Sequence, residues 1–94
     1  MKSEERELQD LISVGPAMLG GFERLGIRSV SHLAQQNPST LYEKLCRAKG
    51  ERIDICCLDL LNAAVAQARN PMLPAEKCQW WYWSRRRKAR DAKK

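Results

Sequence analysis

Apolar side chains recur at helical spacing along most of this chain, and no segment alternates apolar and polar residues as a strand would. The longest such series runs from about Glu51 to Arg69. It places apolar or small side chains at Ile53, Cys56, Cys57, Leu60, Leu61, Ala64, Val65 and Ala68. Residues three and four positions apart share one face of a helix, so this face can pack against a core. The sequence therefore predicts an all-α fold whose longest helix covers about residues 51–69.

Start and stop residues divide the rest of the chain into shorter helices. Ser3, Ser29 and Asn37 are typical helix N-caps, and prolines at positions 16 and 38 suit a first helical turn. Glycine ends a helix readily because it adopts positive φ angles, and Gly26 and Gly50 stand at such ends. We expect helices over about residues 4–12, 16–25, 30–34 and 38–48, and one more turn or short helix at 75–81.

The charge distribution separates a folded body from a basic end. Residues 1–83 hold ten basic and ten acidic side chains, whereas residues 84–94 hold seven basic side chains against Asp91. The end segment therefore carries the whole net charge of +6. We expect one compact domain over residues 1–83, a bundle of about five short helices with a sterile alpha motif (SAM)-like outline. Residues 84–94 are expected to form a basic, disordered tail, with a frayed helical extension as the alternative.

Two adjacent glycines, Gly20 and Gly21, fall inside the expected helix at 16–25. Each lowers helix stability by about 1 kcal/mol relative to alanine. A glycine pair in mid-helix therefore indicates that another backbone packs closely against it.

The segment Leu8-x-x-Leu11-Ile12-Ser13-Val14-Gly15-Pro16, with Leu19, Phe22 and Leu25-Gly26-Ile27 after it, resembles a helix-hairpin-helix motif. The resemblance implies that main-chain amides of the hairpin bind a DNA phosphate, because free amides at a helix start attract anions. The amides are those of Val14, Gly15, Ala17 and Met18, with Arg24 or Arg28 supplying charge nearby. Ser13 replaces a usual glycine and Ala17 a frequent lysine, and both changes weaken phosphate binding. A hairpin that serves only helix packing is the alternative.

A wider resemblance follows from residues on both sides of the long helix. The order Leu25-Gly26-Ile27-Arg28-Ser29-Val30, Pro38, Leu41-Tyr42-Glu43-Lys44-Leu45-Cys46, Asp54, Cys56 and Trp80-Trp81-x-Trp83 is similar to a family of small bacterial proteins named for a pathogenicity locus. Some members of that family are labelled mitomycin-resistance proteins. The match covers roughly residues 8–83, and it implies a helix-hairpin-helix core and association with DNA but no established activity.

Four consecutive aromatic residues, Trp80, Trp81, Tyr82 and Trp83, precede the basic run. In one interpretation, Trp81 and a neighbour clamp the C-terminus onto the bundle. In the other, exposed rings stack on unpaired bases while the basic side chains neutralise phosphates. These basic side chains are Arg85, Arg86, Arg87, Lys88 and Arg90, followed by Lys93 and Lys94.

No group of residues predicts an active site or a metal site. Cys46, Cys56, Cys57 and Cys78 contain no C-x-x-C pair, and adjacent cysteines on a helix diverge by about 100°. The four cysteines are therefore expected to be reduced and to pack in the interior. The only histidine, His32, is expected at the surface. We expect no cofactor and no enzymatic activity.

The sequence favours a binding function. We expect non-sequence-specific contact with nucleic acid, most simply DNA, through hairpin amides and the basic tail. The alternative is a protein–protein adaptor that uses the Trp cluster or the face bearing Gly20 and Gly21. No membrane span or apolar leader follows Met1, so a cytoplasmic location without a membrane partner is expected.

Overall fold

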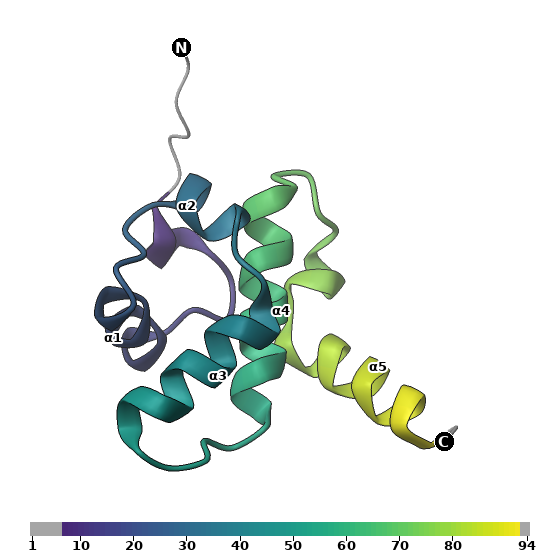
Figure 1. The fold of residues 1–94 in the computed structure, drawn as a ribbon. Coiled ribbons are helices and arrows are strands. Elements are labelled where there is room, and N and C mark those ends of the chain that lie inside the picture. The colour runs from purple at the N-terminus through teal and green to yellow at the C-terminus, as the bar shows by residue number, and fades with distance from the viewer. Residues whose placement is uncertain (1–6, 93–94) are drawn as a thin grey trace.

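A computed structural model describes residues 7–92, and this part of the chain is entirely helical (Figure 1). It contains five α-helices, two short 3-10 helices and no strand, as the sequence predicted. The elements are η1 (Leu8–Asp10), α1 (Pro16–Arg24), α2 (Val30–Ala34), α3 (Pro38–Lys49), α4 (Cys56–Arg69), η2 (Ala75–Cys78) and α5 (Trp80–Ala92). None of these helices combines the length and the apolar character needed to cross a bilayer.

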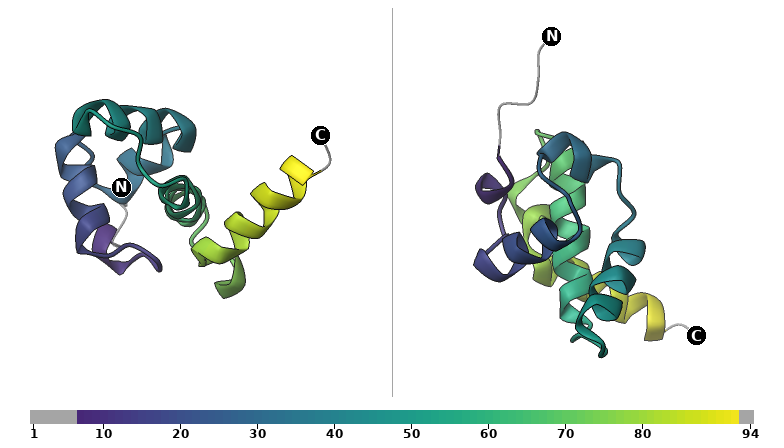
Figure 2. Two further views of the ribbon diagram at one scale, coloured as in Figure 1. Left: turned by 90° about the horizontal axis from the view of Figure 1, so that it is seen from below. Right: turned by 60° about the vertical axis from the view of Figure 1, so that its left-hand side comes forward.

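Helix α4 is the central element of the bundle. Figure 2 shows α1, α2 and α3 on one side of α4 and α5 on the other, and α4 contacts α2, α3, η2 and α5. The largest apolar side chains that are fully buried are Phe22, Val30, Leu33, Leu41, Leu61 and Val65. Each contributes about 1.5–3 kcal/mol through burial, so these contacts account for most of the stabilisation of such short helices.

The expected helix boundaries are confirmed where a cap supports them. The Asn37 side chain accepts hydrogen bonds from the amides of Ser39 and Thr40 at 2.9 and 3.2 Å. The Ser29 hydroxyl accepts one from the amide of His32 at 3.0 Å. Gly50 ends α3 in the left-handed conformation, with φ of 73°. These local interactions set the boundaries before any tertiary contact is considered.

The expected helix over residues 4–12 is wrong for its described part. Residues 1–6, including the expected cap Ser3, lie outside the described residues. From residue 7 onward only the single turn η1 forms. The reason is tertiary, because the amide and carbonyl of Ile12 bond to the side chain of Gln67 at 2.8 and 2.7 Å. Those two backbone groups therefore do not continue a helix.

The long helix starts at Cys56, five residues later than the periodicity predicted. Ile53 donates its amide to the Cys46 sulfur at 3.4 Å, and its carbonyl accepts a hydrogen bond from the Tyr42 hydroxyl. Asp54 then accepts from the amide of Cys56 at 2.9 Å. Side chains of α3 thus bind the backbone of Ile53, and the Asp54 carboxylate binds the first amide of the helix that follows.

The described part of the basic tail is helical rather than disordered. Residues 84–92 continue α5 without a break, which corresponds to the alternative of a helical extension. Ser84 is buried and Arg87 pairs with Asp59, so tertiary contacts hold the helix beyond residue 83. The expected boundary between folded body and tail therefore falls inside one element. Lys93 and Lys94 lie outside the described residues.

The two glycines of α1 differ in their surroundings. A Cβ atom added to Gly21 would lie 3.2 Å from the Leu45 side chain, so close packing explains this glycine. A Cβ atom added to Gly20 would meet nothing within 4 Å. The close neighbour of Gly21 is thus a side chain rather than the expected backbone, and the expected close packing is wrong for Gly20.

Candidate nucleic-acid interface

The turn between η1 and α1, residues 11–15, has the backbone of a glycine-containing turn although a serine occupies the critical position. Ser13 has φ of 73°, the only positive φ of a non-glycine residue in the described chain. Such a conformation is disfavoured by about 1–2 kcal/mol for a residue with a Cβ atom. Ser13 is the position at which the helix-hairpin-helix resemblance led us to expect glycine.

The Ser13 side chain makes contacts that a glycine cannot make. Its hydroxyl donates to the carbonyl of Cys78 at 3.2 Å and accepts from the amide of Trp80 at 3.3 Å. Gln67 spans the same region, because it bonds to Ile12 and lies 3.4 Å from the Cys78 carbonyl. Hydrogen bonds thus join the turn to the start of α5, both directly through Ser13 and through Gln67 of α4. The turn and α5, which the sequence suggested as separate phosphate sites, are therefore connected by these hydrogen bonds.

Three of the four proposed hairpin amides make no hydrogen bond among the described residues, although Met18 itself is buried. The amide of Val14 already donates to the carbonyl of Leu11 at 3.3 Å, so this residue is unsuited to bind phosphate. Leu19 makes the first main-chain bond of α1, to the carbonyl of Gly15 at 3.0 Å. The amides of Ala17 and Met18 precede it and have no carbonyl partner within the helix. Gly15 is the N-cap of α1 and is exposed.

A groove of about 820 Å³ lies beside this helix start. It extends from α1 across the ends of α3 and α4 to the first residue of α5. Most of its lining is apolar, including Pro16, Met18, Leu45, Ile53, Leu60 and Trp80, and Arg24 and Lys49 are its basic residues. Arg28 is exposed but does not line the groove. The hairpin therefore borders an apolar concavity with sparse positive charge.

Helix α5 combines aromatic rings with guanidinium groups. The Arg85 guanidinium lies 4.7 Å from the centre of the Trp81 ring. That of Arg86 lies 5.8 Å from the Tyr82 ring and 5.6 Å from the Trp83 ring. These distances are within the range of cation–π attraction, which holds the long arginine side chains in place.

The tryptophans divide between the two expected roles. Trp83 is partly buried, and its indole nitrogen donates to the carbonyl of Lys77 at 2.8 Å, so it clamps α5 onto η2. Trp80 and Trp81 are 40% and 37% exposed. The expected clamp is thus formed by Trp83 rather than Trp81, and Trp81 remains accessible to a ligand.

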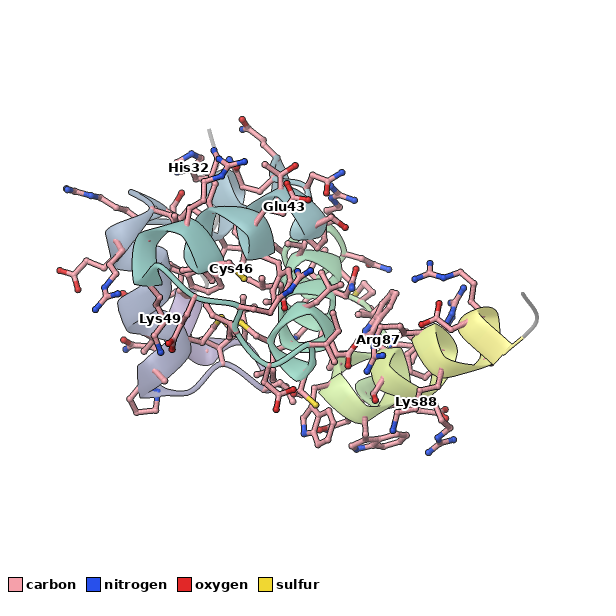
Figure 3. All side chains as sticks on the ribbon, turned by 60° about the horizontal axis from the view of Figure 1, so that its bottom comes forward. His32, Glu43, Cys46, Lys49, Arg87 and Lys88 are labelled. Atoms are coloured by element: carbon pink, nitrogen blue, oxygen red, sulfur yellow. The ribbon has the colours of Figure 1, made fainter. Side chains whose placement is uncertain are left out.

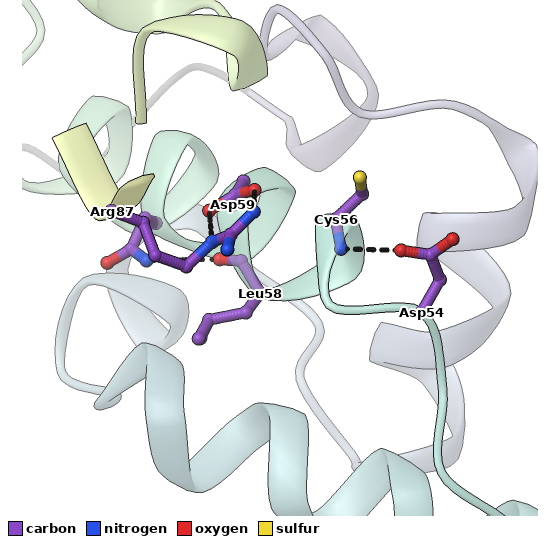
Figure 4. Close-up of polar contacts among 6 residues, drawn as sticks. Asp54, Cys56, Leu58, Asp59 and Arg87 are labelled. Atoms are coloured by element: carbon purple, nitrogen blue, oxygen red, sulfur yellow. Dashed lines mark hydrogen bonds and ion pairs between the residues drawn. The ribbon is translucent and has the colours of Figure 1, made fainter. Parts of the chain in front are cut away.

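Arg87 has a partner inside the protein. Its guanidinium donates two hydrogen bonds of 3.0 Å to the carboxylate of Asp59, which is fully buried (Figure 4). The hydrogen bonds to Asp59 raise the pKa of Arg87, so the guanidinium group stays positively charged. Arg87, proposed from the sequence as a phosphate ligand, therefore anchors α5 to α4.

Sequence reasoning missed Asp59, although a signal was present. Asp59 occurs at four-residue spacing with Ala63 and Gln67, and all three are buried on α4. A carboxylate on a buried helical face requires a cationic partner. The basic run nearest in the sequence begins at residue 85, and periodicity alone does not say which of its members reaches Asp59.

The cysteines and carboxylates do not form a reactive centre within residues 7–92. A hydrogen bond to Asp54 raises the pKa of Cys56, and burial raises the pKa of Cys57, which lowers the fraction of reactive thiolate. The amide of Cys56 donates to Asp54 and holds the pKa of that carboxyl below its ordinary value. No three potential metal ligands come together in the described part of the chain. His32 is exposed, as expected.

The fold and these surfaces define a small all-helical protein with a basic C-terminal helix. The chain matches the family described as "Pathogenicity locus" over residues 2–89 and belongs to that family. Over 86 residues it is 38% identical to a Streptomyces lavendulae protein named mitomycin resistance protein McrB, which covers 92% of this chain and 78% of the relative. No solved structure matches at a significant level. The family resemblance noted in the sequence is confirmed.

Proposed function

We propose that this protein binds nucleic acid without sequence specificity, chiefly through helix α5. The observation that carries the proposal is the segregation of charge. The body has no net charge, and α5 projects from it (Figures 1 and 2). This helix carries four exposed cations. These are Arg85, Arg86, Lys88 and Arg90. A basic helix on a neutral body attracts phosphates over about a Debye length, roughly 8–10 Å at physiological salt.

The exposed ring of Trp81 supports an additional contact with bases. Stacking of a base on an aromatic ring contributes about 1–3 kcal/mol and tolerates any sequence. Arg85 lies over this ring and would exchange its cation–π contact for a phosphate when a base stacks there. We therefore propose that single-stranded DNA or RNA binds better than duplex.

The hairpin is proposed as a secondary site. The amides of Gly15, Ala17 and Met18 present about half a positive charge at the start of α1, whereas α5 presents four full charges. Arg24 and Arg28 are exposed nearby and would extend this site. A strand bound along α5 need not reach the hairpin for affinity.

The test compares two double variants that remove the same charge. Arg85→Gln/Lys88→Gln alters α5, and Arg24→Gln/Arg28→Gln alters the hairpin region. Fluorescence anisotropy with labelled single- and double-stranded oligonucleotides, at several salt concentrations, measures affinity and its salt dependence. We expect the α5 variant to lower the slope of log K against log salt by about 1.5, and the hairpin variant to lower it by less than about 0.5. Equal effects of the two double variants would show that α5 contributes no more to binding than the hairpin region. An unaltered protein that binds no oligonucleotide would refute the proposal.

A protein–protein adaptor is the second candidate, and the apolar groove beside α1 favours it. A partner side chain or helix would bury Pro16, Leu60 and Trp80 there. Gly20→Leu tests this idea, because Gly20 lines the groove and has open space around it. Loss of self-association in sedimentation velocity, without loss of thermal stability, would support the adaptor. We propose binding rather than catalysis in either case, with the cytoplasm as the location.

A further inference from the structure

A second, smaller concavity lies between α4 and α5. Its volume is about 160 Å³. It is lined by Leu58 and Asn62 of α4 and by Trp83, Arg86, Arg87 and Arg90 of α5. We call this site the arginine pocket.

Helical spacing explains why three arginines meet in one place. Residues 86 and 87 lie three and four positions after residue 83, and residue 90 lies four and three positions after them, so the four share one face of α5. Residues 58 and 62 are likewise one turn apart on α4. Figure 3 shows Arg87 pointing from α5 toward the body of the protein and Lys88 pointing to the opposite side. Only part of the basic run therefore reaches the pocket.

Two of the guanidinium groups are held in place without a ligand. Asp59 binds Arg87 through its Nε and one terminal nitrogen, which leaves the nitrogen Nη1 without a hydrogen-bond partner among the described residues. Arg86 donates to the Tyr82 hydroxyl at 3.3 Å and lies against the rings of Tyr82 and Trp83. Groups fixed before binding lose less conformational entropy when a ligand arrives.

The charge in the pocket is only partly balanced by its surroundings. The carboxylate of Asp59 is occupied by Arg87, and neither Arg86 nor Arg90 forms an ion pair within residues 7–92. Asp91, the one acidic residue of α5, does not line the pocket, although its charge acts on Arg87. Guanidinium groups bind phosphate through paired, charge-assisted hydrogen bonds. Arg86 and Arg90, which form no ion pair among the described residues, are therefore suited to bind phosphate beside Arg87.

We infer that the arginine pocket binds one phosphate group of a nucleic-acid strand. The inference rests on the proposed function and adds to it the location of a single, defined contact. A concavity of this volume has room for a phosphate group. The phosphate is either internal to the strand or a terminal phosphomonoester, and the chemistry of recognition is the same.

Arg90→Gln is the test variant, because Arg90 is exposed and has no partner among the described residues. Lys88→Gln is its matched control, since it removes one charge from the opposite side of the same helix. Both are titrated with 3′-labelled single-stranded oligonucleotides that carry a 5′-phosphate or a 5′-hydroxyl. We expect Arg90→Gln to weaken binding more than about tenfold, and Lys88→Gln about threefold.

The two oligonucleotides distinguish the sources of the phosphate. A tenfold loss confined to the 5′-phosphorylated strand would assign a terminal phosphate to the pocket, and an equal loss for both strands would assign an internal one. Equal effects of Arg90→Gln and Lys88→Gln on both strands would overturn the inference and leave the proposed function standing.

A titration with inorganic phosphate separates the pocket from the proposed function. The side-chain Nε–H signal of Arg87, which is held by Asp59, reports on the pocket in ¹H–¹⁵N spectra. We expect phosphate to shift this signal in the unaltered protein and not in Arg90→Gln. A shift without oligonucleotide binding would support the pocket while refuting the proposed function. The absence of any shift would refute the pocket.

Discussion

The turn at residues 11–15 and helix α5, the two regions proposed to contact phosphate, differ in the kind of group that they present. The turn relies on main-chain amides and a conformation maintained by Ser13, with φ of 73°. Helix α5 relies on side-chain charges that extend from a buried ion pair between Arg87 and Asp59. Amides supply directional hydrogen bonds with partial charge, whereas guanidinium groups supply full charge with little dependence on backbone geometry. The resemblance to a hairpin motif and the concentration of positive charge therefore lie in different parts of this protein.

The turn and the segment before α5 are nevertheless both hydrogen-bonded to Gln67. Gln67 of α4 bonds to Ile12 in the turn and to the carbonyl of Cys78 just before α5. Ser13 makes the same connection from the other side. Substitutions can therefore separate the regions, when they alter surface groups, or disturb both, when they alter these hydrogen bonds.

Removal of the buried carboxylate has the largest expected effect. Asp59→Ala leaves the Arg87 guanidinium without its partner and should lower the free energy of unfolding by about 3–5 kcal/mol. Urea denaturation measures the loss, with Asp91→Ala as an exposed control. The double variant Asp59→Leu/Arg87→Leu should recover most of the stability, because no buried charge remains. A double variant as unstable as Asp59→Ala would show that the pair is not the anchor of α5.

Substitution of Gln67 should destabilise the protein less than substitution of Asp59. Gln67→Met keeps the side-chain volume but leaves the amide and carbonyl of Ile12 without their partners. We expect a loss of about 2–3 kcal/mol in unfolding free energy. Hydrogen exchange should also become faster both in the turn and at the start of α5. Gln35→Met, at an exposed position, is the control. Faster exchange in the turn alone would contradict a mechanical connection between the regions.

Removal of the exposed ring tests the role of α5 in base stacking. Trp81→Ala should weaken binding of single-stranded DNA about tenfold and that of duplex DNA less than about twofold, because bases within a duplex are already stacked. Anisotropy titrations with both ligands measure the difference. Trp80→Ala, which alters a ring that lines the groove, is the matched control. Equal losses on both ligands would indicate that Trp81 acts through the fold.

A new negative charge at the start of α1 tests the hairpin. Ala17→Glu interacts favourably with the helix dipole and should raise the unfolding free energy by about 0.3–1 kcal/mol. If the hairpin contacts phosphate, the same variant should weaken DNA binding about threefold by repulsion. Thermal denaturation and anisotropy measure the two effects. Unchanged affinity would assign the hairpin to packing alone.

The pH dependence contributed by Asp54 is the smallest expected effect. Hydrogen bonding from Cys56 lowers the pKa of Asp54, so its ionised form stabilises the fold at neutral pH. This contribution is present above the carboxyl pKa of the unfolded chain, near 4, and is lost as pH falls through the lower folded value. Asp54→Asn keeps the acceptor oxygen and removes the charge. The melting temperature of this variant should therefore be lower than that of the unaltered protein at pH 7. The two values should converge near pH 2–3.

The sequence alone determined the helical class, most helix boundaries and the family. The helical class and the boundaries follow from local causes: apolar spacing, the caps Ser29 and Asn37, and the positive φ of Gly26 and Gly50. It also determined that the charge resides at the C-terminal end. These features require only interactions between residues that are near one another in the chain.

Only the tertiary structure decided how that charge is used. It shortened the first expected helix through Gln67, delayed the start of α4 through Tyr42, and joined Arg87 to Asp59 across 28 positions of sequence. The resulting ion pair separates an anchoring arginine from its neighbours and brings Arg86 and Arg90 to one pocket. Periodicity identifies which residues share a helix face, but the element that this face meets depends on packing between distant segments.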